Sequence, residues 1–441
     1  MSKTPATDAP DLRALIAVAE TGDPDAQFRL AERLRQRGGL DVDVKQAVVW
    51  YLRAAKAGHG GAQYRLGCCF IEGLGAPREP ERALPWLLMA AEQNHAEAQA
   101  LAAWCYHTGT GTTRDMARAL TWYYAAAAGG NFVAQFNLGE IFAKGVGVAQ
   151  DHAAALRHWE TAAQGGYAKA QLNLALAYAN GEGTLRDFEQ AIYWCTRAAE
   201  TGYAKAQYNL GLIYASASYR PDHLDHAERW LAVSAAQGFA PAQYALGRLY
   251  QRGRRKDKGP AEAVAWLRKA ADQGYVKAVY RIALAYEEGE GLAMNRPRAM
   301  AWLRHAAELG YATAQYEIGR RSLFGQAPGI VKEEGIRWFQ KAALQGHVRA
   351  QYGLGICYAS GVGVGRDLAR AYCWLSIAAQ NGLPKAQHRL ALLEAQIDPL
   401  ALAEGRRRVQ IKQREIAAAR NGACGASTTL ENSAGRSRTG H

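Results

Sequence analysis

The sequence of 441 residues lacks any apolar run long enough to cross a membrane, because a spanning helix needs about 18–20 apolar residues in succession. Its longest apolar stretch, residues 84–91, is interrupted by Pro85. The first residues, MSKTPATDAPD, are polar and acidic and do not contain the hydrophobic core of a signal peptide. These absences predict a cytoplasmic protein with no membrane partner.

Cysteine and proline are also scarce. The seven cysteines are odd in number and irregularly spaced, which argues against a disulfide framework and predicts reduced, mostly buried thiols. Glycine (46) and proline (13) together stay well below the roughly 25–30% that marks low complexity. Hydrophobic residues make up 49% and charged residues 21%, which disfavours disordered and coiled-coil classes. The net charge of +13 is a mild basic bias that is compatible with an acidic partner.

Sequence motifs of common enzymes are missing as well. The chain has no Gly-Lys-Ser/Thr phosphate loop, no His-Glu-x-x-His and no Cys-x-x-Cys. The only dense histidine cluster is Asp222-His223 with Asp225-His226. Zinc could use such ligands, but structural zinc sites converge four of them, and Asp and His at a helix entry often serve as caps. We therefore interpret this cluster as structural and expect no catalytic residue, no metal site and no cofactor.

What the sequence does contain is a repeat. An alanine recurs every 36 residues, and glutamine follows it in ten of eleven cases, the exception being Val279. With this alanine as position 0, the copies lie at residues 26, 62, 98, 134, 170, 206, 242, 278, 314, 350 and 386. Position +5 is always Gly or Ala, +8 is usually aromatic, and +24 is Trp in nine copies, with the fourth copy shifted by one place to Trp159.

This spacing predicts two helices in each repeat. Small or apolar residues at 0, +4, +5 and +8 form one helical stripe, and a Gly-x-Gly loop follows. An acidic residue at +17 precedes the second helix; its aspartates, which we expect to be N-caps, are Asp43, Asp115, Asp151, Asp187 and Asp367. A glycine at +32 ends the second helix, as in Gly58, Gly130, Gly166, Gly202 and Gly274.

One helix pair cannot bury such a stripe by itself, so the repeats must stack. The small residue at +5 allows two helices to approach closely, and the tryptophan and tyrosine are expected to fill the space between neighbours. The prediction is an all-α fold, a right-handed α-solenoid of about ten 36-residue helix-turn-helix repeats, instead of the three globular domains that the length alone would suggest.

The pattern A-Q-Y-x-L-G-x-x-Y-x-x-G-x-G-V-x-x-D followed by A-x-x-W-x-x-x-A-A-x-x-G resembles the Sel-one-like repeats, relatives of the tetratricopeptide repeats. The resemblance covers residues 23–396 and implies a scaffold fold that hosts many roles. Some cysteine-rich members are linked to β-lactamase activity. Here no serine is followed three residues later by lysine, and regular cysteine pairs are absent, which argues against the alternative of a β-lactamase-like hydrolase.

The ends of the chain depart from the repeat. Residues 1–22 are expected to hold an N-terminal segment with a capping helix, and 397–420 a basic C-terminal capping helix in which Leu400, Val409 and Ile416 are available for packing. Residues 421–441 are rich in Gly, Ser and Thr and are predicted to be a disordered tail. The sixth, seventh and ninth repeats lose the Gly-x-Gly loop, which indicates either a contact edge or, as we prefer, drift in a tolerant loop.

Candidate binding residues lie on the first helix of each repeat. At 100° per residue, positions −1, +3, +6 and +10 lie opposite the core stripe, on the side that lines the concave groove in tetratricopeptide-type repeats. Position +3 is asparagine in three successive repeats, and cations recur one turn earlier or nearby. The proposed groove residues are Asn137, Lys169, Asn173, Lys205, Asn209, Arg248, Lys277 and Arg281, with Arg252, Arg320, Arg349, Lys385 and Arg389 as further cations.

This set is similar to the carboxylate clamp of chaperone-binding tetratricopeptide domains, where lysines hold carboxylates and asparagines bind peptide backbone. The alternative is that these side chains are ordinary solvated polar residues. The sequence thus predicts a non-enzymatic interaction scaffold for a protein or peptide partner, which could be acidic. A binder of nucleic acid or another anionic polymer, using the 252–258 loop and Arg406–Arg408, is the less favoured alternative, because no dominant basic patch is visible.

Overall fold

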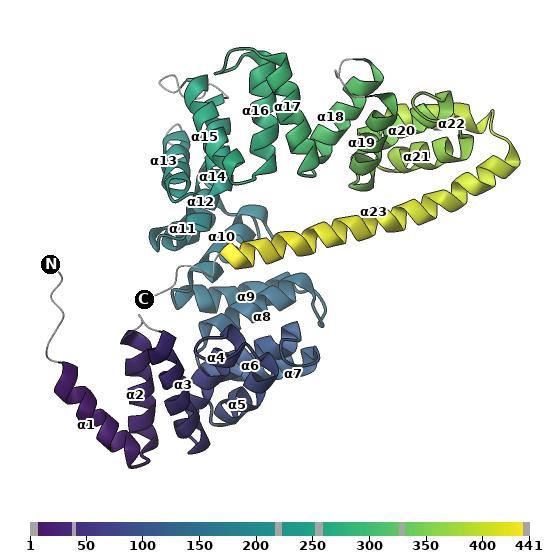
Figure 1. Cartoon of the computed structure of the whole chain (residues 1–441). Coiled ribbons are helices and arrows are strands. Elements are labelled where there is room, and N and C mark those ends of the chain that lie inside the picture. Colours follow the sequence, from purple (N-terminus) through teal and green to yellow (C-terminus); the bar gives the residue numbers. More distant parts are fainter. Residues whose placement is uncertain (1–7, 38–40, 217–222, 252–258, 326–330, 435–441) are drawn as a thin grey trace. The chain divides into compact units, whose positions relative to one another are not determined.

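The computed structural model describes residues 8–37, 41–216, 223–251, 259–325 and 331–434 (Figure 1). All regular secondary structure in these residues is helical, and none of the helices they form is both long and apolar enough to cross a membrane. The chain divides into two compact units, Met1–Trp230 and Leu231–His441, which are described separately.

The helices of the first unit alternate regularly along the chain. Their bounds are α1 Asp8–Glu20, α2 Pro24–Arg37, α3 Asp41–Lys56, α4 Gly60–Glu72, α5 Pro80–Glu92, α6 Ala96–Thr108, α7 Met116–Ala128, α8 Phe132–Lys144, α9 His152–Gln164, α10 Ala168–Asn180, α11 Phe188–Glu200 and α12 Ala204–Ser216. The next helix, α13 (His223–Ala236), contains the boundary between the units.

The second unit continues the same alternation. Its helices are α14 Ala240–Gln251, α15 Pro260–Asp272, α16 Val276–Glu288, α17 Arg296–Glu308, α18 Ala312–Leu323, α19 Lys332–Leu344, α20 Val348–Ser360, α21 Leu368–Gln380, α22 Pro384–Glu394 and α23 Pro399–Ala434. Even-numbered helices are the first helix of a repeat, and odd-numbered helices from α3 to α21 are the second. Within each unit, the second helices α3 to α11 and α15 to α21 pack on the first helix of their own repeat and on that of the next, as the stacking argument predicts.

The tightest packing inside a repeat joins the small residue at +5 to the residue at +25. A Cβ added to Gly67 would lie 2.6 Å from Leu87, and one added to Gly355 would lie 2.6 Å from Leu375. The tryptophan at +24 is only half-buried in most repeats, so the main filler stands one residue later than the sequence pattern suggested.

In the fourth repeat, too, the residue at +25 packs over the small residue at +5, but here it is a tryptophan. Trp159 occupies position +25, where it is 7% exposed and lies over Gly139, whose added Cβ would be 2.3 Å from the indole Nε1. Position +24 is His158, whose Nδ1 is 2.8 Å from Oε1 of Gln135. Trp159 is therefore a core residue of this repeat and not a displaced copy of the tryptophan at +24.

The glutamine that follows the repeat alanine links successive repeats. In eight repeats its Nε2 donates a hydrogen bond of 3.0 to 3.2 Å to the carbonyl of the alanine eight residues earlier, near the end of the preceding second helix. Those glutamines are Gln27, Gln63, Gln99, Gln171, Gln207, Gln243, Gln315 and Gln351. All are buried, so each satisfies a helix-end carbonyl that water reaches poorly.

The predicted caps are mostly confirmed. The carboxylates of Asp115, Asp151, Asp187 and Asp367 each accept a hydrogen bond from a first-turn amide of the second helix. The prediction for Asp43 is wrong, because α3 already begins at Asp41. All five glycines expected to end a second helix have positive φ, between 78° and 92°.

The tight loop between helices explains one strict glycine requirement. Gly111 has φ 71°, and a Cβ added to it would lie 2.2 Å from the carbonyl oxygen of Pro80, at the start of the preceding second helix. No other residue fits there without a backbone shift, so the Gly-x-Gly loop also fixes how one repeat sits on the last.

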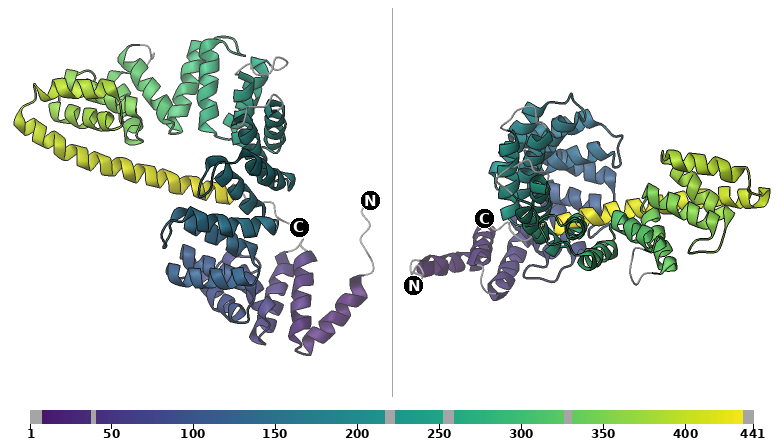
Figure 2. Two further views of the ribbon diagram at one scale, coloured as in Figure 1. Left: turned by 180° about the vertical axis from the view of Figure 1, so that it is seen from behind. Right: turned by 90° about the horizontal axis from the view of Figure 1, so that it is seen from above.

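At the N-terminal end, α1 behaves as a lone second helix, since Gln27 bonds to its residue Ala19 as later glutamines bond to later second helices. At the C-terminal end, Val409 and Ile416 of α23 are buried, but Leu400 is 84% exposed and does not pack as expected. Figure 2 shows α23 from two further sides as one continuous helix. It extends to Ala434, whereas the composition predicted a disordered tail from residue 421; residues 435–441 lie outside the described residues.

The cysteines match the expectation of buried thiols. Within the described side chains all are free, and only Cys68 is partly exposed. Burial raises the pKa of Cys195 and of Cys373 to about 12, which makes both poor nucleophiles.

Candidate partner-binding face

The side chains at positions −1, +3, +6, +7 and +10 of the even-numbered helices form what we call the first-helix face. Neighbouring first helices touch within each unit, as α10 does with α12 and α18 with α20. Polar bonds also cross from repeat to repeat on this face. Arg65 at +3 lies 2.9 Å from the Glu32 carboxylate at +6 of the preceding repeat, and Asn173 donates to Glu140 in the same register.

Glu32 anchors the first such network. Its carboxylate accepts hydrogen bonds from Arg35 and from the Tyr51 hydroxyl, besides its contact with Arg65. Burial by itself raises the pKa of this carboxyl, but the bonds from Arg35 and Tyr51 and the charge of Arg65 outweigh it, so the pKa lies below its ordinary value. Every polar group of this cluster thus has a partner inside the chain.

Five of the predicted groove residues belong to the first unit, and the structure places them on the first-helix face. Lys169 is exposed and forms no ion pair with the described residues, and Asn137 is half-buried with no side-chain hydrogen bond to them. Asn173 donates to Glu140, which also binds Lys144. Asn209 donates to the backbone carbonyl of Lys205 at 2.7 Å, within its own helix.

The asparagine row is consequently less open than the sequence suggested. Two of the three amides use a donor inside the chain, although each keeps its second donor hydrogen and its acceptor oxygen for a ligand. Sequence reasoning missed Glu140. Its position in the repeat could have indicated the contact, because the side chain at +6 of one repeat lies next to the side chain at +3 of the following repeat.

The remaining three predicted residues lie in the second unit. Arg248 is half-buried, and its guanidinium is 3.5 Å from the Gln251 side chain. Lys277 is exposed and Arg281 half-buried, both on α16, and neither forms an ion pair with any other described residue. Arg252, the further cation of this repeat, lies outside the described residues.

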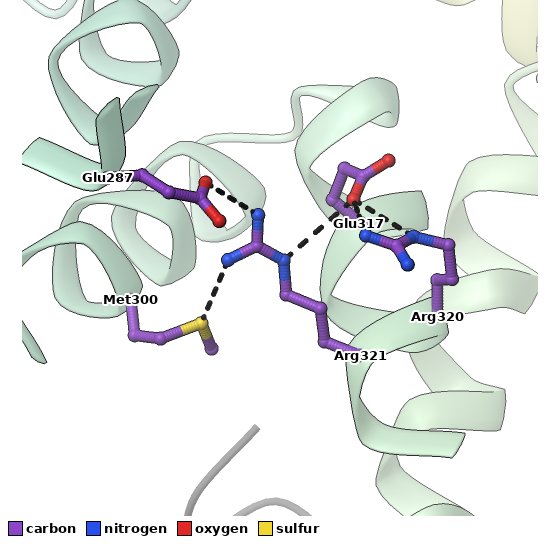
Figure 3. A network of polar contacts seen from close by, with 5 residues as sticks. All are labelled: Glu287, Met300, Glu317, Arg320 and Arg321. Atoms are coloured by element: carbon purple, nitrogen blue, oxygen red, sulfur yellow. Dashed lines mark hydrogen bonds and ion pairs between the residues drawn. The ribbon is translucent and has the colours of Figure 1, made fainter. Parts of the chain in front are cut away.

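A compact ion cluster joins the α18 residues of this face to Glu287 at position +9 of α16 (Figure 3). The Arg321 guanidinium lies 2.8 Å from the Glu287 carboxylate of α16 and 3.8 Å from Glu317. Arg320 binds Glu317 at 2.8 Å, and Arg321 also donates to the Met300 sulfur at 3.6 Å. Arg320, a predicted ligand cation, is therefore engaged inside the chain, and Glu287 and Glu317 are acids that sequence reasoning overlooked.

On the first-helix face of the second unit, as far as the structure describes it, five cations have no acidic partner: Lys277, Arg281, Arg349, Lys385 and Arg389. They stand at −1 and +3 of α16, α20 and α22, so equivalent register positions on stacked helices carry the same charge. The first-helix face of the second unit is accordingly positive, whereas that of the first unit carries charges of both signs that nearly balance.

The other features singled out from sequence add no site. His223 is buried, and both His223 and His226 pack against the Tyr214 ring, at 5.3 and 5.0 Å between ring centroids. No group of three His, Cys, Asp or Glu side chains in the described residues is placed to hold a metal ion. The irregular loops of the sixth, seventh and ninth repeats fall largely at 217–222, 252–258 and 326–330, outside the described residues.

The basic helix α23 also holds fewer free charges than its sequence suggests. Arg407 and Arg408 both pair with Glu404, at 3.4 and 2.7 Å, and Lys412 pairs with Glu415 at 2.6 Å. The nucleic-acid alternative therefore gains no specific support from this helix.

Comparison with known proteins gave consistent matches. A family model described as Sel1 repeat matches ten successive segments: 24–59, 61–95, 96–131, 133–167, 168–203, 204–239, 240–275, 276–311, 312–347 and 348–383. A protective antigen of uropathogenic Escherichia coli strains, which displays an SLR fold, is 28% identical with a TM-score of 0.60, over 93% of this chain and 96% of that one. A Sel1 repeat protein from Oxalobacter formigenes is 33% identical over 49% of this chain and 89% of its own, with a TM-score of 0.46. The comparison with curated proteins gave no match.

Proposed function

The chain belongs to the Sel1 repeat family, and we propose that it is a non-enzymatic scaffold that binds an acidic protein or peptide partner along its first-helix face. Proteins of this family generally act as interaction scaffolds. The proposal specifies the binding surface, which is the first-helix face, and the chemistry of the partner, which is acidic.

One observation carries the proposal: the unpaired cations of the second unit. Lys277, Arg281, Arg349, Lys385 and Arg389 lie on three of the first helices, α16, α20 and α22, without acidic partners among the described residues. Cations without an acidic partner in the chain are available to an acidic ligand. Lysine and arginine at these positions can form charge-assisted hydrogen bonds to carboxylates.

The first unit would contribute differently to the same kind of partner. Asn137, Asn173 and Asn209 each retain amide groups that can bond to an extended peptide backbone, and Lys169 and Lys205 stand one turn before an asparagine. Because Asn173 and Asn209 are already partly engaged, we expect these residues to orient the partner more than to supply affinity.

The experiment compares two charge variants of the full chain. The face variant replaces four cations of the first-helix face by glutamine: Lys277, Arg281, Arg349 and Lys385. The control variant makes the same change in four exposed cations of the second helices α17 and α19 in the same unit: Arg296, Arg304, Lys332 and Arg337. Both variants lose the same net charge, so a general electrostatic effect would weaken them equally.

Partners are captured from the native host with the wild-type chain and identified by quantitative mass spectrometry, and their affinity is then measured by calorimetry. Exposed ion contacts contribute roughly 0.2–1 kcal/mol each, so four of them sum to about 0.8–4 kcal/mol, and the face variant should bind at least about fourfold more weakly while the control keeps its affinity. Equal weakening of both variants, or an unchanged face variant with an intact fold, would contradict the proposed surface.

A further inference from the structure

The C-terminal helix α23 does not pair with α22 as a further repeat would. It packs instead on α21 and α19, the second helices of the last two complete repeats. The approach to α21 is close, because a Cβ added to Gly405 would lie 2.8 Å from the Tyr372 ring and 3.1 Å from the Ala369 carbonyl oxygen. Val409 and Ile416 are buried in this contact.

The sequence of α21 differs from that of the other second helices at a position that α23 packs against. At position +23 the side chain points away from the repeat core, and Tyr193 there is 50% exposed. The same position in α21 is Cys373, which is 2% exposed. The outer surface of α21 is thus built from small and apolar side chains that only α23 shields from water.

A cleft of about 500 Å³ remains between α23 and the helices α19 to α21. Its apolar walls come from Leu344, Trp374 and Ile411, and Ile411 is 44% exposed although it belongs to the face of α23 that turns toward the cleft. The volume falls within the range of about 300–1,000 Å³ that is typical of small-molecule sites.

Cations border the cleft on both sides. Arg370 of α21 and Arg407, Arg408 and Lys412 of α23 all line it. The three arginines contact acidic residues through Nε: Arg370 with Asp367, and Arg407 and Arg408 with Glu404. Their terminal Nη groups donate no hydrogen bond to any described residue, although the Arg370 guanidinium also lies 5.5 Å from the centroid of the Tyr358 ring.

These Nη groups are the donors that suit a carboxylate, because the planar guanidinium fork matches the two carboxylate oxygens. Both carboxylates inside the cleft, Glu404 and Glu415, are already bound to cations of their own helix. They therefore do not use the open arginine donors, and an incoming anion can.

We propose that this cleft binds a small amphipathic carboxylate: an aromatic or aliphatic body that lies against Leu344, Trp374 and Ile411, with its carboxylate on the arginines. The site is formed mainly by second helices and α23, so it is separate from the first-helix face. Its failure would leave the proposed scaffold function untouched, and the reverse also holds.

The first test is calorimetric titration of the full chain with 2-naphthoate, and with the neutral analogue 2-naphthylmethanol as the matched ligand. One saturable site per chain is expected for 2-naphthoate, and binding at least tenfold weaker for the alcohol, which cannot use the arginine donors. Equal affinity for the two ligands, or non-saturating uptake of several molecules, would overturn the proposal.

The second test uses matched variants of α23. Arg407→Gln removes a cation that lines the cleft, and Arg406→Gln removes the neighbouring exposed cation that does not. Ile411→Glu places a carboxylate on the apolar wall, and Leu400→Glu does the same at an exposed site outside the cleft.

We expect Arg407→Gln to weaken 2-naphthoate binding about two- to fivefold and Ile411→Glu at least tenfold, with both controls unchanged. Circular dichroism checks that all four variants remain folded, which is expected because the altered side chains are exposed. If each cleft variant behaves like its control, the cleft is not the site.

Discussion

The glutamine link between repeats leads to a prediction that can be worked through in detail. Gln315 is 3% exposed; it donates to the Ala307 carbonyl at 3.0 Å and accepts a bond from Gln345 at 2.9 Å. The substitution Gln315→Met keeps the length of the side chain and removes both bonds. The control is Gln387→Met, at the same repeat position, because Gln387 is exposed and its side chain forms no hydrogen bond with the described residues.

The contacts set the size of the effect. The Ala307 carbonyl still accepts the Gly310 amide at 3.0 Å, so the substitution does not leave it unpaired. Gln345 is exposed and can bond to water instead. The loss is then mainly one buried hydrogen bond, about 1–1.5 kcal/mol. At 1.4 kcal/mol per factor of ten, local opening at the α17–α18 junction becomes about five- to tenfold more frequent.

Hydrogen exchange followed by mass spectrometry on the full chain is the suitable assay, because stacked repeats open locally and a single unfolding midpoint would average over them. Peptides from α17 and α18 should exchange faster in Gln315→Met, while peptides around α21 and α22 should be unchanged in Gln387→Met. Equal acceleration at both sites, or none at α17 and α18, would refute the view that this bond holds neighbouring repeats together.

Two further predictions concern a loop glycine and a helix cap. Gly111→Ala should destabilise its repeat by about 3 kcal/mol, since the added Cβ meets the Pro80 carbonyl. Gly130→Ala, with positive φ but open space, should cost only about 1 kcal/mol, and hydrogen exchange of peptides on either side of each glycine checks the difference. Burial, assisted by a nearby arginine, lowers the pKa of His347. Its neutral Nδ1 accepts a hydrogen bond from a first-turn amide of α20 and so caps this helix. The cap therefore stabilises α20 above the ordinary histidine pKa, and this stabilisation is lost as the pH falls below it. His347→Asn keeps the cap, as Asn131 does in another repeat. After correction for the intrinsic pH dependence of amide exchange, the opening of α20 should then become more frequent by a smaller factor between pH 7.5 and 5.5 than in the wild type, and an identical increase would contradict this role.

Much of the fold could be predicted from the sequence because each repeat carries its own local instructions. Aspartate at +17 caps the second helix, and glycine at +32 ends it, through bonds and backbone angles that involve only a few neighbouring residues. The regular 36-residue spacing then required stacking, since a single amphipathic pair has nowhere else to bury its apolar stripe.

Only the tertiary structure could decide which side chains meet across repeats and which are left free. The +25 filler, the glutamine bonds and the Arg321–Glu287 pair all depend on how one helix lies on the next, which a periodic sequence does not specify. The same holds for α23: the sequence showed a basic helix, but its return over α21, which buries Cys373 and leaves a cleft, is a long-range contact. By itself the sequence determined the repeat, its helices and their caps, because these are local; the structure decided the available charges and the cleft, because those depend on residues far apart in the chain.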